Sequence, residues 1–475
     1  MARPNPSINR PLITEIPAER IPTDLMDWVV GFVDCPGLVF LDSALRHDSL
    51  GRYSFIAADP IHRLVSHGDA TTIDGAPFAG SPFEAIAHLL ARYPVEQVPG
   101  LPPFQTGLAG QFGYGLRHHV ESVPAHARGD HGFPDIELGW YDVVVAVDHR
   151  EHRAFVFASG AEPEARTEWA LSRLNGQARF PAPDWEIEPT PDLTADQHRR
   201  AVRRTIDYIE AGDIYQANIT QRFQADLPEG FDRPGMKRLA LYDALRRQNP
   251  ATFAAYVDFG GTALLSSSPE RFLKVEAGVI ETRPIKGTRP RGSNPALDAA
   301  LARELQASEK DRAENLMIVD LLRNDVGRVA KLGSVQVPVL IGLETYATVH
   351  HLVSVVTAAL DDGKSTVDLL CAAFPGGSVT GAPKIRAMEI IAELEPTERG
   401  PYCGAVGYLS AGGAMDTNIV IRTLLIDGDR ITFQVGGGIV ADSDPQAEWE
   451  ESLTKAKALI QTLAGRGKRA AKKSA

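Results

Sequence analysis

The sequence has few cysteines and no apolar run long enough to cross a membrane. Its three cysteines, Cys35, Cys371 and Cys403, lie far apart and form no Cys-x-x-Cys pair. This spacing supports neither a disulfide framework nor a structural zinc site, and it favours a reducing compartment. The uncharged apolar stretch Thr345 to Leu360 includes two histidines and is shorter than the roughly 18–20 residues of a membrane helix. We therefore expect no membrane helix.

The sequence also has fewer basic than acidic residues. The 49 Lys and Arg residues are outnumbered by 61 Asp and Glu residues, which gives a net charge of −12. A nucleic-acid binder needs a basic face, and the only dense basic run is the last ten residues, so we expect no nucleic-acid partner. The N-terminus contains Pro and Glu where a signal peptide would be apolar, which predicts a cytoplasmic protein. Hydrophobic residues at 44% and charged residues at 23% are close to the averages for folded proteins and exclude wholesale disorder.

One proline-rich stretch divides the chain. Phe180 to Asp192 contains four prolines, and each removes a backbone donor and restricts the residue before it. We interpret residues 181–193 as a linker between an N-terminal region, residues 1–180, and a second domain, residues 194–464. The basic end, residues 465–475, lacks apolar periodicity and is predicted to be a disordered tail. A length of 475 residues allows two to four domains, since a domain typically has about 100–200 residues.

The second region alternates between helix and strand patterns. Thr194 and Gln197 form a capping box before apolar residues at helical spacing, which predicts a helix over residues 195–211. Upstream, the β-branched segments 37–41 and 141–147 predict strands, so the N-terminal region is expected to be mainly β. Further helices are predicted at 296–307, 309–325, 384–394 and 447–464, and strands at 252–258, 262–267, 271–275, 404–410, 418–426 and 431–435. This pattern predicts a mixed α/β domain with many antiparallel strands.

Two glycine-rich segments allow close approach to a ligand. In residues 376–386, Pro383 interrupts what would be a phosphate loop, because it removes an N–H group that would bind phosphate. What remains is either a structural turn or a helix start whose free N–H groups favour a carboxylate. Gly436, Gly437 and Gly438 follow a predicted strand, where they either let the backbone approach a ligand or form a bulge.

Three glutamates are candidate metal ligands. Glu448, Glu451 and Lys455 share one face of a predicted helix. Taken alone, Glu451 and Lys455 are equally explained as a surface ion pair worth about 0.3–0.5 kcal/mol. Glu314 lies where its helix turns apolar, and a carboxylate beside a core usually needs a cation or several donors. If the three glutamates meet across two helices, the cluster suits Mg²⁺, which prefers oxygen ligands.

Lys286 and Glu270 are candidates for nucleophilic and acid–base chemistry. Lys286 lies in a strand-like segment, where it is either a solvated edge residue or a nucleophilic amine whose pKa a cleft lowers. Glu270 follows a strand and a proline, a place where a side chain can point into a cavity. A carboxyl group there acts as a general acid if burial raises its pKa.

Together these motifs resemble the chorismate-using enzymes, a family that includes anthranilate, aminodeoxychorismate, isochorismate and salicylate synthases. The resemblance covers residues 195–463 and is carried by Ser-Pro-Glu at 268–270, Arg-Pro-Ile-Lys-Gly-Thr at 283–288, and the segments 311–328, 350–354, 380–388 and 416–423. Lys286 and the Tyr-Gln-x-Asn segment at 215–218 resemble the aminodeoxychorismate synthases, whereas anthranilate synthases generally have Ala and Phe-Gln-x-Val there. The resemblance implies an α/β fold in which two antiparallel β-sheets pack as a sandwich with helices outside.

The resemblance also implies roles for single residues. It implies Mg²⁺ binding by Glu314 and Glu451, with Glu448 acting through water, so that the ion holds the ring carboxylate of chorismate. Gly287 and Thr288 are implied to line the same pocket. The carboxylates of chorismate are implied to be held by a larger set, namely Tyr402, Arg422, Lys455 and the backbone N–H groups of Gly436, Gly437 and Gly438.

The reaction that the resemblance implies is the amination of chorismate. Lys286 would add to ring C2 while Glu270 protonates the departing C4 hydroxyl, and ammonia would then enter at C4 and expel the lysine. The product would be 4-amino-4-deoxychorismate, the precursor of 4-aminobenzoate and folate. His351 is tied in anthranilate synthases to the aromatising step, and here it is either catalytic or a packed structural histidine.

The implied source of ammonia lies outside the chain. A glutaminase needs a nucleophilic Cys on a Gly-flanked turn, and none of the three cysteines has that context, so a separate glutamine amidotransferase subunit is the implied partner. The segments that sense tryptophan in anthranilate synthases correspond to residues 41–43 and 249–253, and the substitutions there predict that tryptophan does not inhibit. A tryptophan retained in a structural role is the alternative. The alternatives to an aminodeoxychorismate synthase are an anthranilate synthase component and a catalytically silent subunit that binds chorismate or metal.

Overall fold

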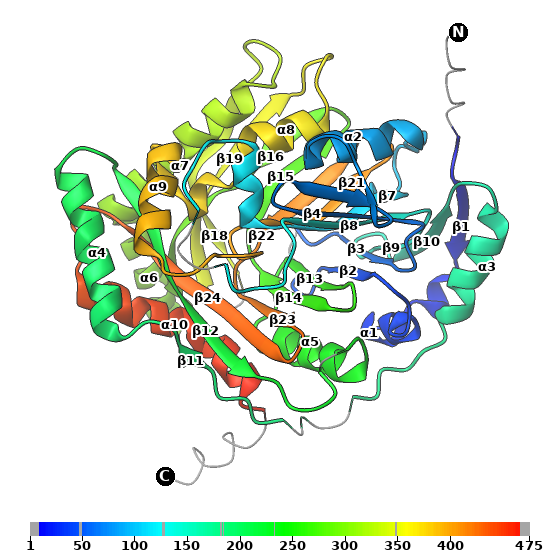
Figure 1. Ribbon diagram of the computed structural model, residues 1–475, viewed down its shortest axis with the longest axis horizontal. Helices are drawn as coiled ribbons and strands as arrows, with labels where there is room; N and C mark the ends of the chain where they lie inside the picture. The colour runs from blue at the N-terminus through cyan, green and yellow to red at the C-terminus, as the bar shows by residue number, and fades with distance from the viewer. Residues whose placement is uncertain are drawn as a thin grey trace.

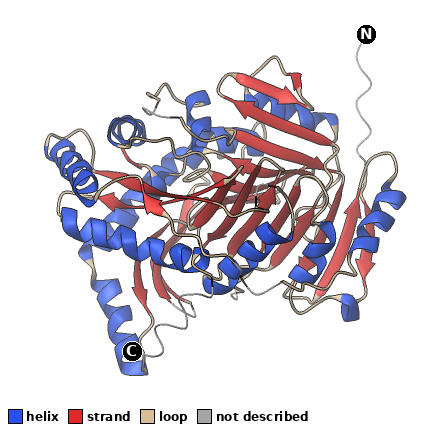
Figure 2. Cartoon of the chain, turned by 60° about the horizontal axis from the view of Figure 1, so that its bottom comes forward, coloured by secondary structure: helices blue, strands red, loops and turns tan. Residues whose placement is uncertain are grey.

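The structure, a computed structural model, describes residues 9–46, 50–125, 129–180, 183, 185–231, 233–346 and 349–465. In this part of the chain the strands form two antiparallel sheets of twelve strands each. The sheets pack face to face, and helices surround them (Figures 1 and 2). This arrangement confirms the expected sandwich of antiparallel sheets with helices outside.

Both sheets are long and combine distant parts of the chain. Sheet I has the order β1 (Leu12–Ile16), β10 (Arg153–Ala158), β9 (Val143–Asp148), β3 (Tyr53–Ala57), β2 (Leu38–Asp42), β13 (Phe253–Asp258), β14 (Thr262–Ser268), β23 (Thr423–Asp427), β24 (Arg430–Ile439), β12 (Gln216–Asp226) and β11 (Thr190–Pro191), with β20 (Gly381–Ala382) paired to β12. Sheet II has the order β17 (Ile285–Pro290), β19 (Val349–Ala359), β16 (Val279–Thr282), β15 (Arg271–Glu276), β22 (Met415–Ile419), β21 (Ala405–Ser410), β7 (Gly107–Phe112), β8 (Ile136–Tyr141), β4 (His62–His67), β5 (Ala70–Ile73) and β6 (Ala76–Pro77), with β18 (Gln336–Thr345) paired to β19.

The helices divide between the two outer faces. Sheet I is covered by α1 (Met26–Val29), α3 (Pro163–Arg173), α4 (Ala195–Glu210), α5 (Met236–Gln248), α9 (Lys384–Leu394) and α10 (Pro445–Leu463). Sheet II is covered by α2 (Pro82–Arg92), α6 (Pro295–Ala307), α7 (Glu309–Gly327) and α8 (Thr366–Ala373). Short 3₁₀ turns occur at Ala18–Arg20, Val30–Phe32, Tyr114–His119 and Gly377–Val379. None of the described helices is long and apolar enough to cross a membrane.

The apolar core has layers on both sides of each sheet. Along β9, Val143, Val145 and Val147 pack against the helices outside sheet I, whereas Val144 and Ala146 pack between the two sheets. Successive side chains of a strand point to opposite faces, so a strand that is covered on both faces needs an unbroken apolar run. This explains why the β9 segment shows no polar alternation in the sequence.

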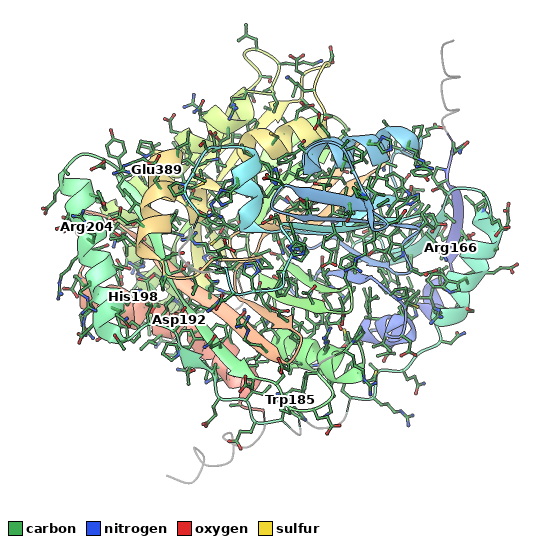
Figure 3. All side chains as sticks on the ribbon, in the orientation of Figure 1. Arg166, Trp185, Asp192, His198, Arg204 and Glu389 are labelled. Atoms are coloured by element: carbon green, nitrogen blue, oxygen red, sulfur yellow. The ribbon has the colours of Figure 1, made fainter. Side chains whose placement is uncertain are left out.

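The predicted linker packs against the second region. Trp185 is 5% exposed, and its Nε1–H donates to the Thr462 carbonyl at 3.3 Å, while β11 pairs with β12 (Figure 3). Strands from both sides of this segment contribute to both sheets. The division into separate domains at residues 1–180 and 194–464 stays a prediction, and the predicted tail lies outside the described residues after Gly465.

Consecutive strands pass from one sheet to the other at several short corners. The prediction of one strand over residues 418–426 is wrong, because β22 belongs to sheet II and β23 to sheet I. The predicted strand 141–147 likewise includes the end of β8 and most of β9, which lie in different sheets. Another corner joins β14 to β15. Val420 stays buried at its corner, so the continuous apolar pattern conceals the bend.

Candidate active site

Two of these corners bring Glu270 and Arg422 together. Glu270 lies between β14 and β15, Arg422 lies between β22 and β23, and the strands before and after them are paired. The Ile419 N–H donates to the Glu270 carbonyl at 3.0 Å, and the Ser267 N–H donates to the Arg422 carbonyl at 3.2 Å. Arg422 has a φ of 52°, a left-handed conformation that costs a non-glycine residue about 1–3 kcal/mol. The surrounding pairings hold this strained residue where its charge interacts with the Glu270 carboxyl.

Glu270 has the environment of a general acid. It is 7% exposed, and burial raises its pKa to about 7. A hydrogen bond from the Ser378 side chain and the positive charge of Lys286 oppose this rise. Close to neutral pH the carboxyl group is therefore present in both protonation states, as a proton donor requires.

Lys286 points into the same region from β17. Its Nζ donates to the Ser378 carbonyl at 3.2 Å. Burial lowers the pKa of the ammonium group, although the negative charges of Glu314 and Glu270 act in the opposite direction. A lowered pKa increases the fraction of neutral amine, which is the nucleophilic form. This placement argues against the alternative of a solvated edge lysine.

The two residues after Lys286 pack closely against neighbouring side chains. Gly287 has a φ of 84°, and a Cβ there would lie 2.9 Å from the Asp311 Cβ. Thr288 Oγ1 and His351 Nδ1 are 2.8 Å apart. Burial lowers the pKa of His351 to about 4, so its ring is neutral at physiological pH. His351 thus has a hydrogen-bonded, packed position beside the candidate nucleophile.

The triglycine of β24 is not a bulge. Gly436, Gly437 and Gly438 pair in regular register with residues 218–220 of β12. A Cβ on Gly436 would lie 2.2 Å from the Ile219 carbonyl oxygen, so only glycine fits this approach. A Cβ on Gly437 would instead lie 3.0 Å from an oxygen of Glu448 and 3.8 Å from an oxygen of Glu451. Gly437 therefore leaves free space below two carboxylates.

Those carboxylates come from α10, and a third comes from α7. Glu448 is 8% exposed and accepts a hydrogen bond from Ser443 Oγ at 2.7 Å, while Glu451 pairs with Lys455 Nζ at 2.8 Å. Burial raises the pKa of Glu314 and of Glu448. The negative charge of Glu448 adds to the rise at Glu314, and that of Glu451 adds to the rise at Glu448. Lys455 Nζ also donates to the Gly436 carbonyl at 2.8 Å, which joins α10 to the triglycine.

The donor set fits a hard divalent cation. Carboxylate oxygens around the space above Gly437 are ligands that Mg²⁺ prefers, and neighbouring negative charges favour a cation between them. In the described part of the chain no three acidic, His or Cys side chains are already grouped as metal ligands. Lysine ammonium groups compensate the charge instead, with Lys310 Nζ at 3.8 Å from Glu448 and Lys455 beside Glu451.

Tyr402 lies on a tight turn beside the Arg422 corner. It is 6% exposed, and the next residue, Cys403, has a φ of 64° and donates its N–H to the Val420 carbonyl at 2.9 Å. The ring packs in the apolar layer outside sheet II with Phe272. The backbone of this turn is therefore connected directly to the corner that carries Arg422.

Sequence reasoning missed Ser378. Its hydroxyl bonds to the Glu270 carboxyl, its carbonyl accepts from Lys286, and Asn218 Nδ2 lies 3.5 Å from the same carbonyl. The only signal was its place in the glycine-rich segment 376–386, which the pattern assigned to a turn or a carboxylate-binding helix start. Only the folded chain brings this turn to the acid and the amine.

A separate cavity of about 340 Å³ lies between the sheets. It is lined by residues 41–43 and by Thr252 and Phe253, the segments that correspond to the tryptophan-sensing segments of anthranilate synthases. Two arginines in its wall already have partners, since Arg52 pairs with Asp148 and Arg271 with Asp416. The absence of inhibition by tryptophan stays a prediction.

The comparisons with known proteins agree with this geometry. The chain is 41% identical over 437 residues to aminodeoxychorismate synthase component 1 of Salmonella typhimurium, covering 90% of this chain and 93% of that protein. It is 42% identical to anthranilate synthase component 1 of Thermus thermophilus, covering 78% and 80% of the two chains. The crystal structure of anthranilate synthase component I from Streptococcus pneumoniae superimposes with a TM-score of 0.76 at 32% identity, covering 88% of this chain and 93% of that one. Residues 41–461 match the chorismate binding enzyme family, and the chain belongs to this family.

Proposed function

We propose that this chain converts chorismate and ammonia to 4-amino-4-deoxychorismate. The observation that carries the proposal is that the amine of Lys286 lies beside the carboxyl group of Glu270, and that burial raises the pKa of this carboxyl group to about 7. Aminodeoxychorismate synthase component 1 of Salmonella typhimurium, at 41% identity, supports the same reaction. The pathway then leads to 4-aminobenzoate and folate.

Each step of the reaction uses a group of this chain. Neutral Lys286 Nζ forms a bond to ring C2, the ring double bonds shift, and the C4–O bond breaks. Glu270 gives its proton to the departing oxygen, which leaves as water. Ammonia then bonds to C4, the double bonds shift back, and the C2–N bond to Lys286 breaks. The added nitrogen gives one proton back to the Glu270 carboxylate, and Lys286 leaves as the neutral amine, so the enzyme returns to its starting state and one water is produced for each ammonia consumed.

The remaining residues would bind the substrate. Glu314, Glu448 and Glu451 would hold Mg²⁺, which supplies positive charge for the ring carboxylate of chorismate. The other carboxylate contacts would come from Tyr402, Arg422, Lys455 and the N–H groups of Gly436, Gly437 and Gly438, with Gly287 and Thr288 beside them. This clamp would fix a dianion on a protein whose net charge is −12.

Ammonia would come from a separate glutamine amidotransferase subunit. Burial raises the pKa of all three thiols, to about 12 for Cys403, which opposes formation of a nucleophilic thiolate. The "component 1" in the name of the Salmonella relative supports a two-component enzyme. Three free cysteines also favour a reducing compartment, and we expect the cytoplasm.

The second candidate is an anthranilate synthase component. The Thermus relative at 42% identity favours it, as does His351, whose neutral ring hydrogen-bonds to Thr288 in the candidate site. Lys286 decides between the two, because the resemblance associates a lysine at this position with aminodeoxychorismate synthases.

Product analysis tests the proposal. The purified chain is incubated with chorismate, Mg²⁺ and ammonium, and an aminodeoxychorismate lyase is then added. We expect 4-aminobenzoate that appears only after the lyase. Formation of anthranilate without the lyase would support the second candidate. If neither 4-aminobenzoate nor anthranilate is formed, the result would favour a silent binding subunit.

A further inference from the structure

The buried guanidinium of Arg399 lies behind the candidate active site. Arg399 is 1% exposed, and Nε and Nη2 donate to the two carboxylate oxygens of Glu395 at 2.8 and 2.7 Å. Its other donations go to the main chain, from Nη1 to the Val379 carbonyl at 2.9 Å and from Nη2 to the Asn218 carbonyl at 2.8 Å. The Tyr114 ring covers the guanidinium at 4.8 Å. One side chain therefore connects segments that are far apart in the sequence.

The contact with Val379 reaches the candidate acid and nucleophile. Val379 directly follows Ser378, whose hydroxyl bonds to Glu270 and whose carbonyl accepts from Lys286. The orientation of the peptide between residues 378 and 379 therefore sets where the carbonyl partner of Lys286 lies, and the position of the Ser378 backbone sets where its hydroxyl meets Glu270. Arg399 fixes the next carbonyl along this backbone.

The other contacts reach the substrate-binding side. Asn218 on β12 pairs with Gly438 on β24. The Arg399 carbonyl accepts the Tyr402 N–H at 3.1 Å, at the start of the turn that carries Tyr402. Arg399 thus holds the loop behind Ser378, the strand beside the triglycine and the Tyr402 turn at fixed relative positions.

A contribution to stability alone does not explain why the ion pair between Arg399 and Glu395 is buried. Removing two charges from water costs several kcal/mol per ion, and well-packed apolar residues often replace such pairs without loss of stability. Apolar residues cannot, however, donate to two carbonyl groups in fixed directions, as the planar guanidinium does. The geometry is therefore better explained by positioning than by stability.

We propose that Arg399, oriented by Glu395, is a positioning residue that fixes the Ser378 loop against β12 and thereby the relative placement of Lys286 and Glu270. The inference rests on the proposed function, because it assumes that these two residues are the nucleophile and the acid. Arg399 acts through Ser378 rather than through contact with the substrate.

The test compares Arg399→Lys with a matched control, Arg238→Lys. Arg238 is also completely buried, and it donates to the Asp258 carboxylate at 3.1 Å and to the carbonyls of Phe231 and Gly260 at 2.7 and 2.9 Å. It lies on α5, away from the candidate site. Lysine keeps the charge in both variants but cannot donate in three fixed directions. Each purified full-length variant is assayed for ammonia-dependent kcat, KM for chorismate, pH profile and Tm.

We expect Arg399→Lys to lower kcat at least about tenfold with little change in KM, since a misplacement of about 1 Å can cost 10²-fold. The alkaline limb of its pH profile should move to higher pH, because a weaker bond from Ser378 stabilises the Glu270 carboxylate less. Arg238→Lys should lose a similar amount of Tm and keep kcat within about twofold.

Two outcomes would contradict the role proposed for Arg399. Equal Tm losses with unchanged kcat and pH profile in both variants would overturn the proposal and leave Arg399 a structural residue. If Arg399→Lys does not fold, Glu395→Gln, which keeps the side-chain shape and one acceptor, must show the same kcat loss and pH shift for the proposal to stand. A wild-type chain that yields anthranilate or no product would instead refute the proposed function, independently of Arg399.

Discussion

At the scale of single residues, burial moves the pKa values of the candidate acid and nucleophile in opposite directions. It raises the pKa of Glu270 to about 7 and lowers that of Lys286, so both move toward the neutral form. Desolvation disfavours whichever form is charged, and this explains why one environment acts on the two groups in opposite ways. The same pocket therefore favours a protonated acid and an unprotonated amine, as the proposed first step requires.

Replacement of Lys286 tests the covalent mechanism. An amine that forms a covalent intermediate divides one difficult displacement into two easier ones, so Lys286→Ala should lower kcat at least about 10²-fold. The carboxylate clamps remain, so KM for chorismate should change little. Lys286→Arg should be nearly as inactive, because a guanidinium stays protonated and cannot attack. Steady-state ammonia-dependent rates check this, with Lys274→Ala on β15 of the same sheet as the control that keeps activity. Recovery of most of the rate in Lys286→Arg would reduce Lys286 to an electrostatic role.

The pH profile reports on Glu270. Its carboxyl group donates a proton below its pKa of about 7 and loses this ability as the pH rises through that value. We therefore expect kcat/KM for chorismate to fall above about pH 7. The measurement must hold free ammonia constant, because protonation of ammonia would otherwise change the nucleophile concentration. A profile that stays flat from pH 6 to 9 would contradict the role of Glu270 as acid.

Some residues of the candidate site could not be predicted from the sequence. Lys286 and Glu270 stood in recognisable motifs, and the fold brings them together at Ser378. Ser378 and Arg399 gave no such signal, because their importance comes from contacts with residues more than a hundred positions away, such as Asn218. No local pattern encodes a hydrogen bond over that separation.

At the scale of elements, α10 and β24 together form the candidate metal and carboxylate site. Asp444 caps the start of the helix, because its side chain accepts from the N–H groups of Gln446 and Ala447, and so fixes where the turn that carries Glu448 begins. The strand provides glycines where side chains would collide with the helix or with β12. Sequence patterns located both elements, although β24 continues through the triglycine to Ile439 instead of ending at residue 435, and they could not show that the two elements face each other.

Gly437→Ala tests the space between these elements. The backbone of Gly437 is not left-handed, so alanine is tolerated, but its Cβ would lie 3.0 Å from a Glu448 oxygen. We expect Tm to change little and KM for chorismate to rise about 10- to 100-fold, because the added methyl group occupies space that the ligand needs. Gly261→Ala, at a position where a Cβ meets no atom within 4 Å, is the control. An unchanged KM in Gly437→Ala would remove the triglycine from the binding site.

Glu451→Gln tests the metal site on α10. It keeps the side-chain size and removes one negative charge, so the fold should persist while Mg²⁺-dependent activity falls on the order of 10–100-fold or more. Calorimetric titration with Mg²⁺ should show weaker binding than in the wild type. Glu450→Gln, one position earlier on the exposed side of the helix, should bind Mg²⁺ normally. If Glu451→Gln also binds and uses Mg²⁺ normally, Glu451 and Lys455 are a surface ion pair.

Corners were harder to predict than helices. The helix over residues 384–394 was predicted with its observed bounds, because apolar periodicity is a local signal. The strand predicted over 418–426 is instead two strands in different sheets. Its corner holds Arg422 at a φ of 52°, a conformation that propensity alone would not assign to arginine. The surrounding pairings impose it, and they form only when the sheets pack.

At the scale of the whole molecule, both sheets are built from strands before and after the Pro-rich segment. β2 pairs with β13, and β7 pairs with β21, so the N-terminal region extends the sheets that carry the candidate site. Long-range antiparallel pairing of this kind cannot be read from local periodicity. The resemblance to a family supplied the sandwich, whereas the residues alone indicated only many antiparallel strands.

The choice of nitrogen source is a property of the whole chain. Glutamine hydrolysis needs an activated thiolate, and burial raises the pKa of Cys35, Cys371 and Cys403 alike. The purified chain should therefore use ammonium and give no turnover with glutamine, until a glutamine amidotransferase subunit is added. Lyase-coupled formation of 4-aminobenzoate measures both reactions, and Cys371→Ala, at the one half-buried cysteine, should leave the ammonium-dependent rate unchanged. Sustained turnover with glutamine by the chain alone would contradict this prediction, and loss of that turnover in Cys371→Ala would identify the thiol responsible.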